Sequence, residues 1–185
     1  MRDGEPLLPP HGGYRGLKAY QNAEVVHDAT VVFCRRFLGS FDRTVDQMVQ
    51  AARSGKQNIA EGSLVSGTSK ASELKLVGVA RASLEELRID YEDFLRQRDF
   101  ATWSKDDEKA VFIRRLAHRT DRSYRTYQTY VEDKSPETAA NTMICLIQQT
   151  CFLLDRLKAE LGRRLLEEGG MNERIYRERK KRRGY

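Results

Sequence analysis

The sequence lacks long apolar runs, and it lacks the patterns that mark strands and phosphate loops. Its 185 residues contain no run of about 18 apolar residues, so we expect no membrane-spanning helix. No stretch alternates polar and apolar residues for long enough to predict a strand, and no internal repeat is present. Gly12-Gly13 and Gly169-Gly170 have neither the spacing of a P-loop nor a strand before them. These absences favour a soluble, all-helical chain.

Cysteine is scarce as well. Cys34, Cys145 and Cys151 form no C-x-x-C pair, and each lies in an apolar helical stretch without a neighbouring base. We therefore expect buried free thiols, as in a reducing compartment, rather than disulfides or a catalytic nucleophile. The first sixteen residues contain acids and prolines but no apolar segment, so no signal peptide is expected. The chain is expected in the cytoplasm.

Positive charge is abundant but unevenly placed. The formal net charge is +6, and the stretch from Gly162 to Tyr185 has nine Lys/Arg against four Glu, a local net charge of +5. The rest of the chain is therefore close to neutral. Five basic residues are consecutive, from Arg179 to Arg183. Because blocks of like charge repel one another, we expect this tail to be disordered in the absence of a partner.

Apolar residues recur at spacings of three and four in four long stretches, which is the pattern of amphipathic helices. We predict helices over about 17–38, 43–64, 69–98 and 136–168. Ser135-Pro136 is a strong start signal for the last of them. The fold class expected is all-α, an antiparallel up-down four-helix bundle. Its helices occupy 17–168, with an irregular arm over 1–16, an insertion over 99–134 and a basic tail over 169–185.

The second helix carries two glycines and two polar residues on consecutive turns, namely Gly55, Asn58, Glu61 and Gly62. Each glycine lowers helix propensity by about 1 kcal/mol relative to alanine, so we expect both to serve a close helix contact. Asn58 and Glu61 should then find polar partners on the third helix, such as Arg81 or Ser83, or on another subunit. The prediction is that Gly62→Leu disrupts the bundle or its assembly.

An enzymatic interpretation of the same motif stays open. Glu61 could be a general base or metal ligand together with Glu85 and Glu86 of the third helix. Glu24 and His27 add an E-x-x-H half-motif, but a di-iron site needs two such motifs and two further glutamates. The remaining histidines, His11 and His118, do not supply the second motif. We expect no catalytic site, no metal and no cofactor.

Three segments together resemble a known family. They are Gln47–Ser54, the "NIAEG" core at Asn58–Gly62, and Val79–Leu87 with its "AxxSLxEL" pattern. They resemble the four-helix-bundle family of proteins encoded in intervening sequences of bacterial 23S rRNA genes. That family includes the accessory variability proteins of diversity-generating retroelements. The resemblance covers about 17–98 and, more loosely, 136–161.

The resemblance implies an up-down bundle that assembles into a homo-oligomeric ring, commonly a pentamer. Retroelement members are similar basic rings that bind a reverse transcriptase and RNA, and no enzymatic activity is implied. This chain departs from the short members by the insertion over 99–134 and by the tail, as does a longer subset of the family. The insertion could change what the outer surface binds.

The insertion should contain one extra helix over 104–133. Its apolar face would comprise Ile113, Leu116, Ala117, Tyr124, Tyr127 and Val131. Arg115, Arg119 and Arg122 would lie along another face, where arginine alternating with tyrosine can bind nucleic acid. Nearby carboxylates almost cancel this charge, so an ordinary solvated face is the alternative.

The tail offers the denser set of cations: Arg177, Arg179, Lys180, Lys181, Arg182 and Arg183. Each phosphate that such residues neutralise releases counterions and adds affinity for nucleic acid. A solvated tail, or contact with an acidic protein or membrane, are the alternatives, although a bulky apolar face for membrane binding is missing. We therefore expect a non-enzymatic, ring-forming helical scaffold that binds RNA, DNA or a nucleic-acid-processing protein. The alternative is a purely structural interaction protein without nucleic acid.

Overall fold

The computed structural model describes residues 10–39, 42–117, 119 and 123–183, and every regular element in them is helical. The all-α prediction is therefore confirmed for the described part of the chain. A 3-10 turn, η1 (Tyr14–Gly16), precedes seven α-helices. These are α1 (Lys18–Phe37), α2 (Arg43–Val65), α3 (Lys70–Arg96), α4 (Glu108–Leu116), α5 (Tyr124–Glu132), α6 (Pro136–Glu168) and α7 (Met171–Arg183).

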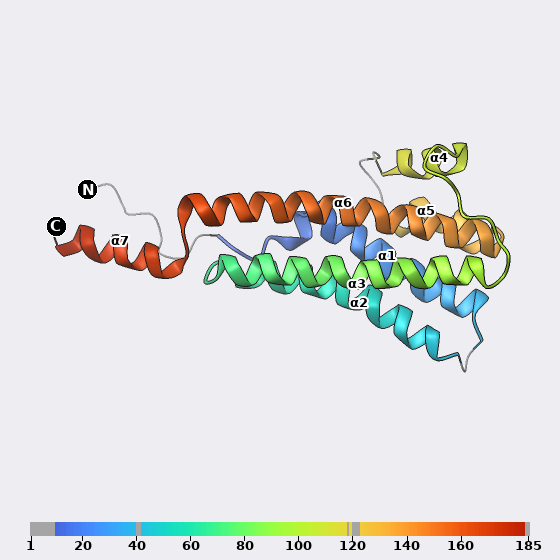
Figure 1. The fold of residues 1–185 in the computed structure, drawn as a ribbon, viewed down its shortest axis with the longest axis horizontal. Helices are drawn as coiled ribbons and strands as arrows, with labels where there is room; N and C mark the ends of the chain where they lie inside the picture. The colour runs from blue at the N-terminus through green and yellow to red at the C-terminus, as the bar shows by residue number, and fades with distance from the viewer. Residues whose placement is uncertain (1–9, 40–41, 118, 120–122, 184–185) are drawn as a thin grey trace.

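Each of the four long helices packs against two of the others. α2 contacts α1 and α3, and α6 contacts the same two helices from the other side. In Figure 1 α3 and α6 run beside each other along the long axis of the molecule. Large side chains from all four helices fill the centre and are buried, among them Phe33, Met48, Leu87, Tyr91 and Met143. The apolar stripes therefore meet in one core.

Side-chain caps define where the long helices begin. The Asp42 carboxylate accepts a hydrogen bond from the Thr44 amide at 2.9 Å, and the Ser69 hydroxyl accepts one from the Ser72 amide at 3.1 Å. Ser135 caps α6 in the same way, with Pro136 in the first turn. Each cap satisfies an amide that has no partner within its helix. At the other end of α6, Gly169 has φ of 73°, which only glycine adopts without strain.

The expectation of one extra helix over 104–133 is wrong. α4 ends at Leu116, and α5 starts at Tyr124, after Ser123, which forms a capping box with Thr126. The two short helices have different neighbours, because α4 packs on α6 whereas α5 packs on both α1 and α6. One straight helix could not keep both apolar faces on these partners. The insertion therefore contains two short helices, each with its own set of neighbours.

The basic tail is helical rather than irregular, which corrects the expectation of disorder for its described part. Arg, Lys and Glu are good helix formers, and Gly169-Gly170 lets a new helix start in another direction. α7 extends beyond the ends of α3 and α6 (Figure 1) and makes no extensive packing contact with another described helix. None of its described side chains is fully buried. No helix in the described ranges is long and apolar enough to span a bilayer.

Candidate nucleic-acid interface

Helix α7 begins against the turn between α2 and α3. Met171 and Arg174 share a small depression with Gly67 and Lys70 of that turn. The Arg177 guanidinium donates a hydrogen bond to the carbonyl oxygen of Glu168, in the last turn of α6. A cation is favourable there because the free carbonyls at a helix C-terminus carry partial negative charge. The start of α7 is thus attached, and the rest of it projects.

Three cations of the projecting part are exposed: Arg179, Lys180 and Arg183. None of the three forms an ion pair with a carboxylate in the described part of the chain. By contrast, Arg163 in α6 lies 2.8 Å from Glu160 and 2.7 Å from Glu167. The α7 cations are therefore available to phosphates in a way that Arg163 is not. The side chains of Lys181 and Arg182 are outside the described set.

The second predicted basic surface does not form as one helix face. Arg115 is exposed in the last turn of α4, whereas Arg119 is exposed beyond the end of that helix. Arg122 and His118 lie outside the described residues. Figure 1 places α4 and α5 toward the opposite end of the molecule from α7. The two sets of predicted cations are therefore not parts of one patch.

Gly55 and Gly62 lie on the buried face of α2, against α3. A Cβ atom on Gly55 would come within 2.7 Å of the Leu84 side chain. A Cβ atom on Gly62 would lie 3.4 Å from the Glu73 carbonyl oxygen and from the Leu76 side chain. At Gly55 the missing side chain lets α3 approach α2 closely, whereas at Gly62 a methyl group would make ordinary contacts.

The two polar residues between these glycines form no hydrogen bond or ion pair with a described residue of α3, contrary to expectation. The Asn58 side-chain amide donates to the carbonyl oxygen of Ser54 in its own helix at 2.8 Å. Glu61 is exposed, because it points away from the stripe that contains Gly55 and Gly62. The expectation that Arg81 serves them is wrong for contacts within the chain. A partner for Asn58 or Glu61 on another subunit stays a prediction.

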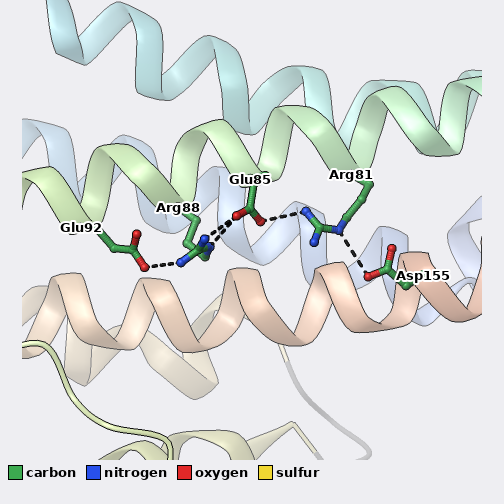
Figure 2. Close-up of polar contacts among 5 residues, drawn as sticks. All are labelled: Arg81, Glu85, Arg88, Glu92 and Asp155. Carbon is green, nitrogen blue, oxygen red and sulfur yellow. Dashed lines mark hydrogen bonds and ion pairs between the residues drawn. The ribbon is translucent and has the colours of Figure 1, made fainter.

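Arg81 belongs instead to a charge ladder along α3, which we define as Arg81, Glu85, Arg88, Glu92 and Asp155. Figure 2 shows Arg81 between Glu85 of its own helix and Asp155 of α6, at 2.8 Å and 3.4 Å. Arg88 in turn bridges Glu85 and Glu92. The sequence signal for the ladder is the i, i+3 and i, i+4 spacing of opposite charges, which sequence reasoning overlooked.

The ladder decides what Glu85 can do chemically. The hydrogen bond from Arg88 lowers the pKa of Glu85, and the bond from Arg81 acts in the same direction. A carboxylate held ionised by two guanidinium groups is a weak base, so the arrangement does not suit general-base chemistry. Glu86 points outward and is exposed.

The described side chains considered as metal ligands do not form a cluster in the structure. Glu24 is exposed, and the His27 Nδ1 atom lies 3.3 Å from the Asp28 carboxylate. Within the described ranges no group of three or more His, Cys, Asp or Glu side chains could hold a metal ion.

The three cysteines are free and buried. Burial raises the pKa of the Cys34 thiol to about 12 and those of Cys145 and Cys151 to about 11. The thiols are thus protonated near neutral pH, and a protonated thiol is a poor nucleophile.

An aromatic groove that sequence reasoning missed lies on the insertion. We define it by Trp103, Lys109, Phe112, Ile113, Tyr130 and Lys134, which surround a space of about 520 Å³. Its residues come from the loop after α3, from α4, and from the end of α5 and the turn that follows it. A single helix over 104–133 would not bring Phe112 and Tyr130 together, whereas two separate helices do, with ring centroids 5.9 Å apart. The available signal was the concentration of aromatic residues in the insertion, among them Trp103, Phe112 and Tyr130, together with its lysines.

No protein-family model, curated protein or solved structure matches the chain. The resemblance to the 23S rRNA intervening-sequence family therefore stays a prediction made from the motif residues.

Proposed function

We propose that the chain is a non-catalytic helical scaffold that binds nucleic acid through basic surfaces, foremost through α7. In this proposal α1, α2, α3 and α6 form an antiparallel four-helix bundle, and α4 and α5 belong to an insertion between its last two helices. The observation that carries the proposal is the projecting helix α7, whose exposed Arg179, Lys180 and Arg183 have no described ion-pair partner.

The geometry of α7 favours phosphate as the ligand. Cations on a helix that packs on little else are accessible from several sides, and Arg can bind a phosphate with two parallel hydrogen bonds. A membrane surface would require an apolar face opposite the charges. On α7 only Met171, Ile175 and Tyr176 are large and apolar, and all three lie in its first half. Free buried thiols fit the proposed cytoplasmic location.

Self-association would strengthen a weak contact. A homo-oligomeric ring, of which a pentamer is the proposed form, would present several copies of α7 to one nucleic-acid molecule. Linked contacts raise the overall affinity through their effective concentration. A nucleic-acid-processing protein, such as a reverse transcriptase, is the related partner that the proposal includes.

The test is fluorescence anisotropy with labelled single-stranded RNA and duplex DNA over a salt series. Three proteins are compared: the full chain, a chain ending at Gly169, and a full-length variant with Arg179, Lys180 and Arg183 changed to Gln. We expect tight binding by the full chain at low salt and a large loss in both variants. The slope of log K against log salt should become shallower by about 2 for the single strand and by about 2.7 for the duplex when three phosphate contacts are lost.

The matched control changes three exposed cations on the long helices, Arg43, Arg53 and Lys75, to Gln. This variant has the same net charge as the α7 variant, so it should retain most of the affinity if α7 is the binding element. Equal losses in both triple variants would show a general charge effect and contradict the role of α7. No binding by the full chain at low salt would contradict the nucleic-acid proposal itself.

The second candidate is a purely structural interaction protein. It is favoured by large apolar side chains on the surface of α6, where Phe152 is 62% and Leu166 is 89% exposed. Such side chains suit contact with another protein or another copy of this chain. Light scattering would decide whether Phe152→Ser and Leu166→Ser lower the molar mass of the particle in solution.

A further inference from the structure

The aromatic groove is open and has aromatic walls. Phe112 is 49% exposed although it is a large apolar side chain, and its ring centroid lies 5.9 Å from that of Tyr130. Trp103 lines the same space, with the Lys109 ammonium 5.7 Å from the centroid of its ring. Rings that leave one face to solvent can accept a flat, aromatic ligand between them.

Buried hydrogen bonds hold the walls in place. Asn141 of α6, which is 1% exposed, accepts a hydrogen bond from the Trp103 amide at 2.8 Å. Its own amide group donates to the Ala101 carbonyl oxygen at 2.8 Å. Gln149 donates to the carbonyl oxygen of Arg114 at 2.9 Å and so attaches the end of α4 to α6. The groove is therefore preformed, which lowers the entropy cost of binding.

The charges at the rim select for an anion. Lys109 and Lys134 line the groove with one carboxylate, Glu108. Glu108 lies in the first turn of α4, where the positive end of the helix dipole offsets part of its charge. The rim therefore carries a positive potential next to aromatic surface.

We propose that the aromatic groove takes up an unpaired base of a single-stranded nucleic acid. The base stacks between Trp103, Phe112 and Tyr130, while Lys109 and Lys134 bind the flanking phosphates. Stacking on aromatic side chains beside a basic track is how proteins bind single strands without sequence preference. A base within a duplex is stacked on its neighbours and cannot enter. The inference rests on the proposed function and adds that single strands are the preferred form.

Trp103 is the one tryptophan of the chain, so its fluorescence reports directly on the groove. The experiment titrates the full-length protein at low salt with oligouridylate of about ten nucleotides and, separately, with duplex DNA. We expect oligouridylate to quench Trp103 in a saturable way and the duplex to leave its emission almost unchanged. Equal quenching by both would overturn the inference.

Phe112→Ala tests the stacking. We expect it to weaken oligouridylate binding about tenfold, in the range known for loss of one stacked base. The matched control is Ile89→Ala on α3, which truncates an apolar side chain that is 48% exposed and lies outside the groove, and it should leave the affinity unchanged. Equal affinities for the two variants would overturn the inference.

The lysines are tested in the same titration. Changing both Lys109 and Lys134 to Gln should lower the salt slope by about 1.4, whereas Lys75→Gln on α3 should not. Oligouridylate that binds by anisotropy without quenching Trp103 would refute the groove and leave the proposed role of α7 intact. Failure of the full chain to bind any nucleic acid at low salt would refute both.

Discussion

Gly55 and Gly62 differ in how much space α3 leaves beside them. A methyl group on Gly55 would come within 2.7 Å of the buried Leu84 side chain, whereas one on Gly62 would be at an ordinary contact distance of 3.4 Å. We expect Gly55→Ala to lower the free energy of unfolding by about 1–2 kcal/mol, since overpacking outweighs the gain in helix propensity. Gly62→Ala should leave it unchanged or raise it by up to about 1 kcal/mol. Urea unfolding measures both.

A side chain larger than alanine should not be tolerated at position 62 either. Leucine at position 62 would need space that Leu76 and the Glu73 backbone occupy, so Gly62→Leu should lower the melting temperature. Equal stabilities of Gly55→Ala and Gly62→Ala would contradict the account. So would an unchanged melting temperature and particle mass for Gly62→Leu.

The buried thiol of Cys34 makes stability depend on alkaline pH. Burial raises its pKa from 9.0 in the unfolded chain to about 12 in the folded one. The folded state thus keeps a proton that the unfolded state loses, and its contribution is complete below about pH 9 and lost as pH rises toward 12. Above about pH 9 the loss attributable to this thiol approaches about 1.4 kcal/mol per pH unit.

Cys34→Ala should therefore reduce the alkaline loss of stability. Urea unfolding at about pH 8 and about pH 10 gives the free energy of unfolding of the variant and of the parent chain. The other buried thiols and Tyr91 are present in both proteins, so their contributions largely cancel in the comparison. The stability difference between the two proteins should shift in favour of the variant at the higher pH. An equal difference in unfolding free energy at both pH values would contradict the account in which burial raises the pKa of the Cys34 thiol.

At the scale of elements, the insertion depends on one buried amide. Asn141 joins α6 to the loop that carries Trp103 through two hydrogen bonds, and both distances are 2.8 Å. Asn141→Ala would leave partly buried backbone groups of the loop without these partners, so we expect a loss of about 2 kcal/mol in unfolding free energy. The Trp103 emission should also move to longer wavelength as the loop admits water. Gln148→Ala, at an exposed neighbouring position, is the control. An unchanged emission spectrum in Asn141→Ala would contradict the positioning role.

For the molecule as a whole, α7 should add function without adding stability. None of its described side chains is fully buried, and it projects past the ends of α3 and α6 (Figure 1). A chain ending at Gly169 should therefore melt within about 2 °C of the full chain, because little apolar surface is lost. Circular dichroism during heating measures this. A fall of many degrees would mean that α7 packs against the long helices or against another copy.

Patterns local to a few turns were read correctly from the sequence. The all-helical class follows from the 3-4 spacing of apolar residues, and the start of α6 follows from Ser135-Pro136. The site was predicted less well. Arg179, Lys180 and Arg183 are exposed, and their binding to nucleic acid stays a prediction. The aromatic groove was not expected, and within the chain Asn58 bonds to Ser54 of its own helix instead of α3.

The sequence by itself determined that the chain is helical, where its long helices lie, and that its positive charge is concentrated near one end. Each of these depends on residues within a few turns of one another, where propensity, capping and periodicity act. Only the tertiary structure decided that the insertion bends into α4 and α5, that Arg81 pairs with Asp155, and that Trp103, Phe112 and Tyr130 share one groove. These arrangements join segments distant in the chain. Their geometry depends on which surfaces of the packed helices are left for the insertion to cover. The order of residues along the chain does not specify those surfaces.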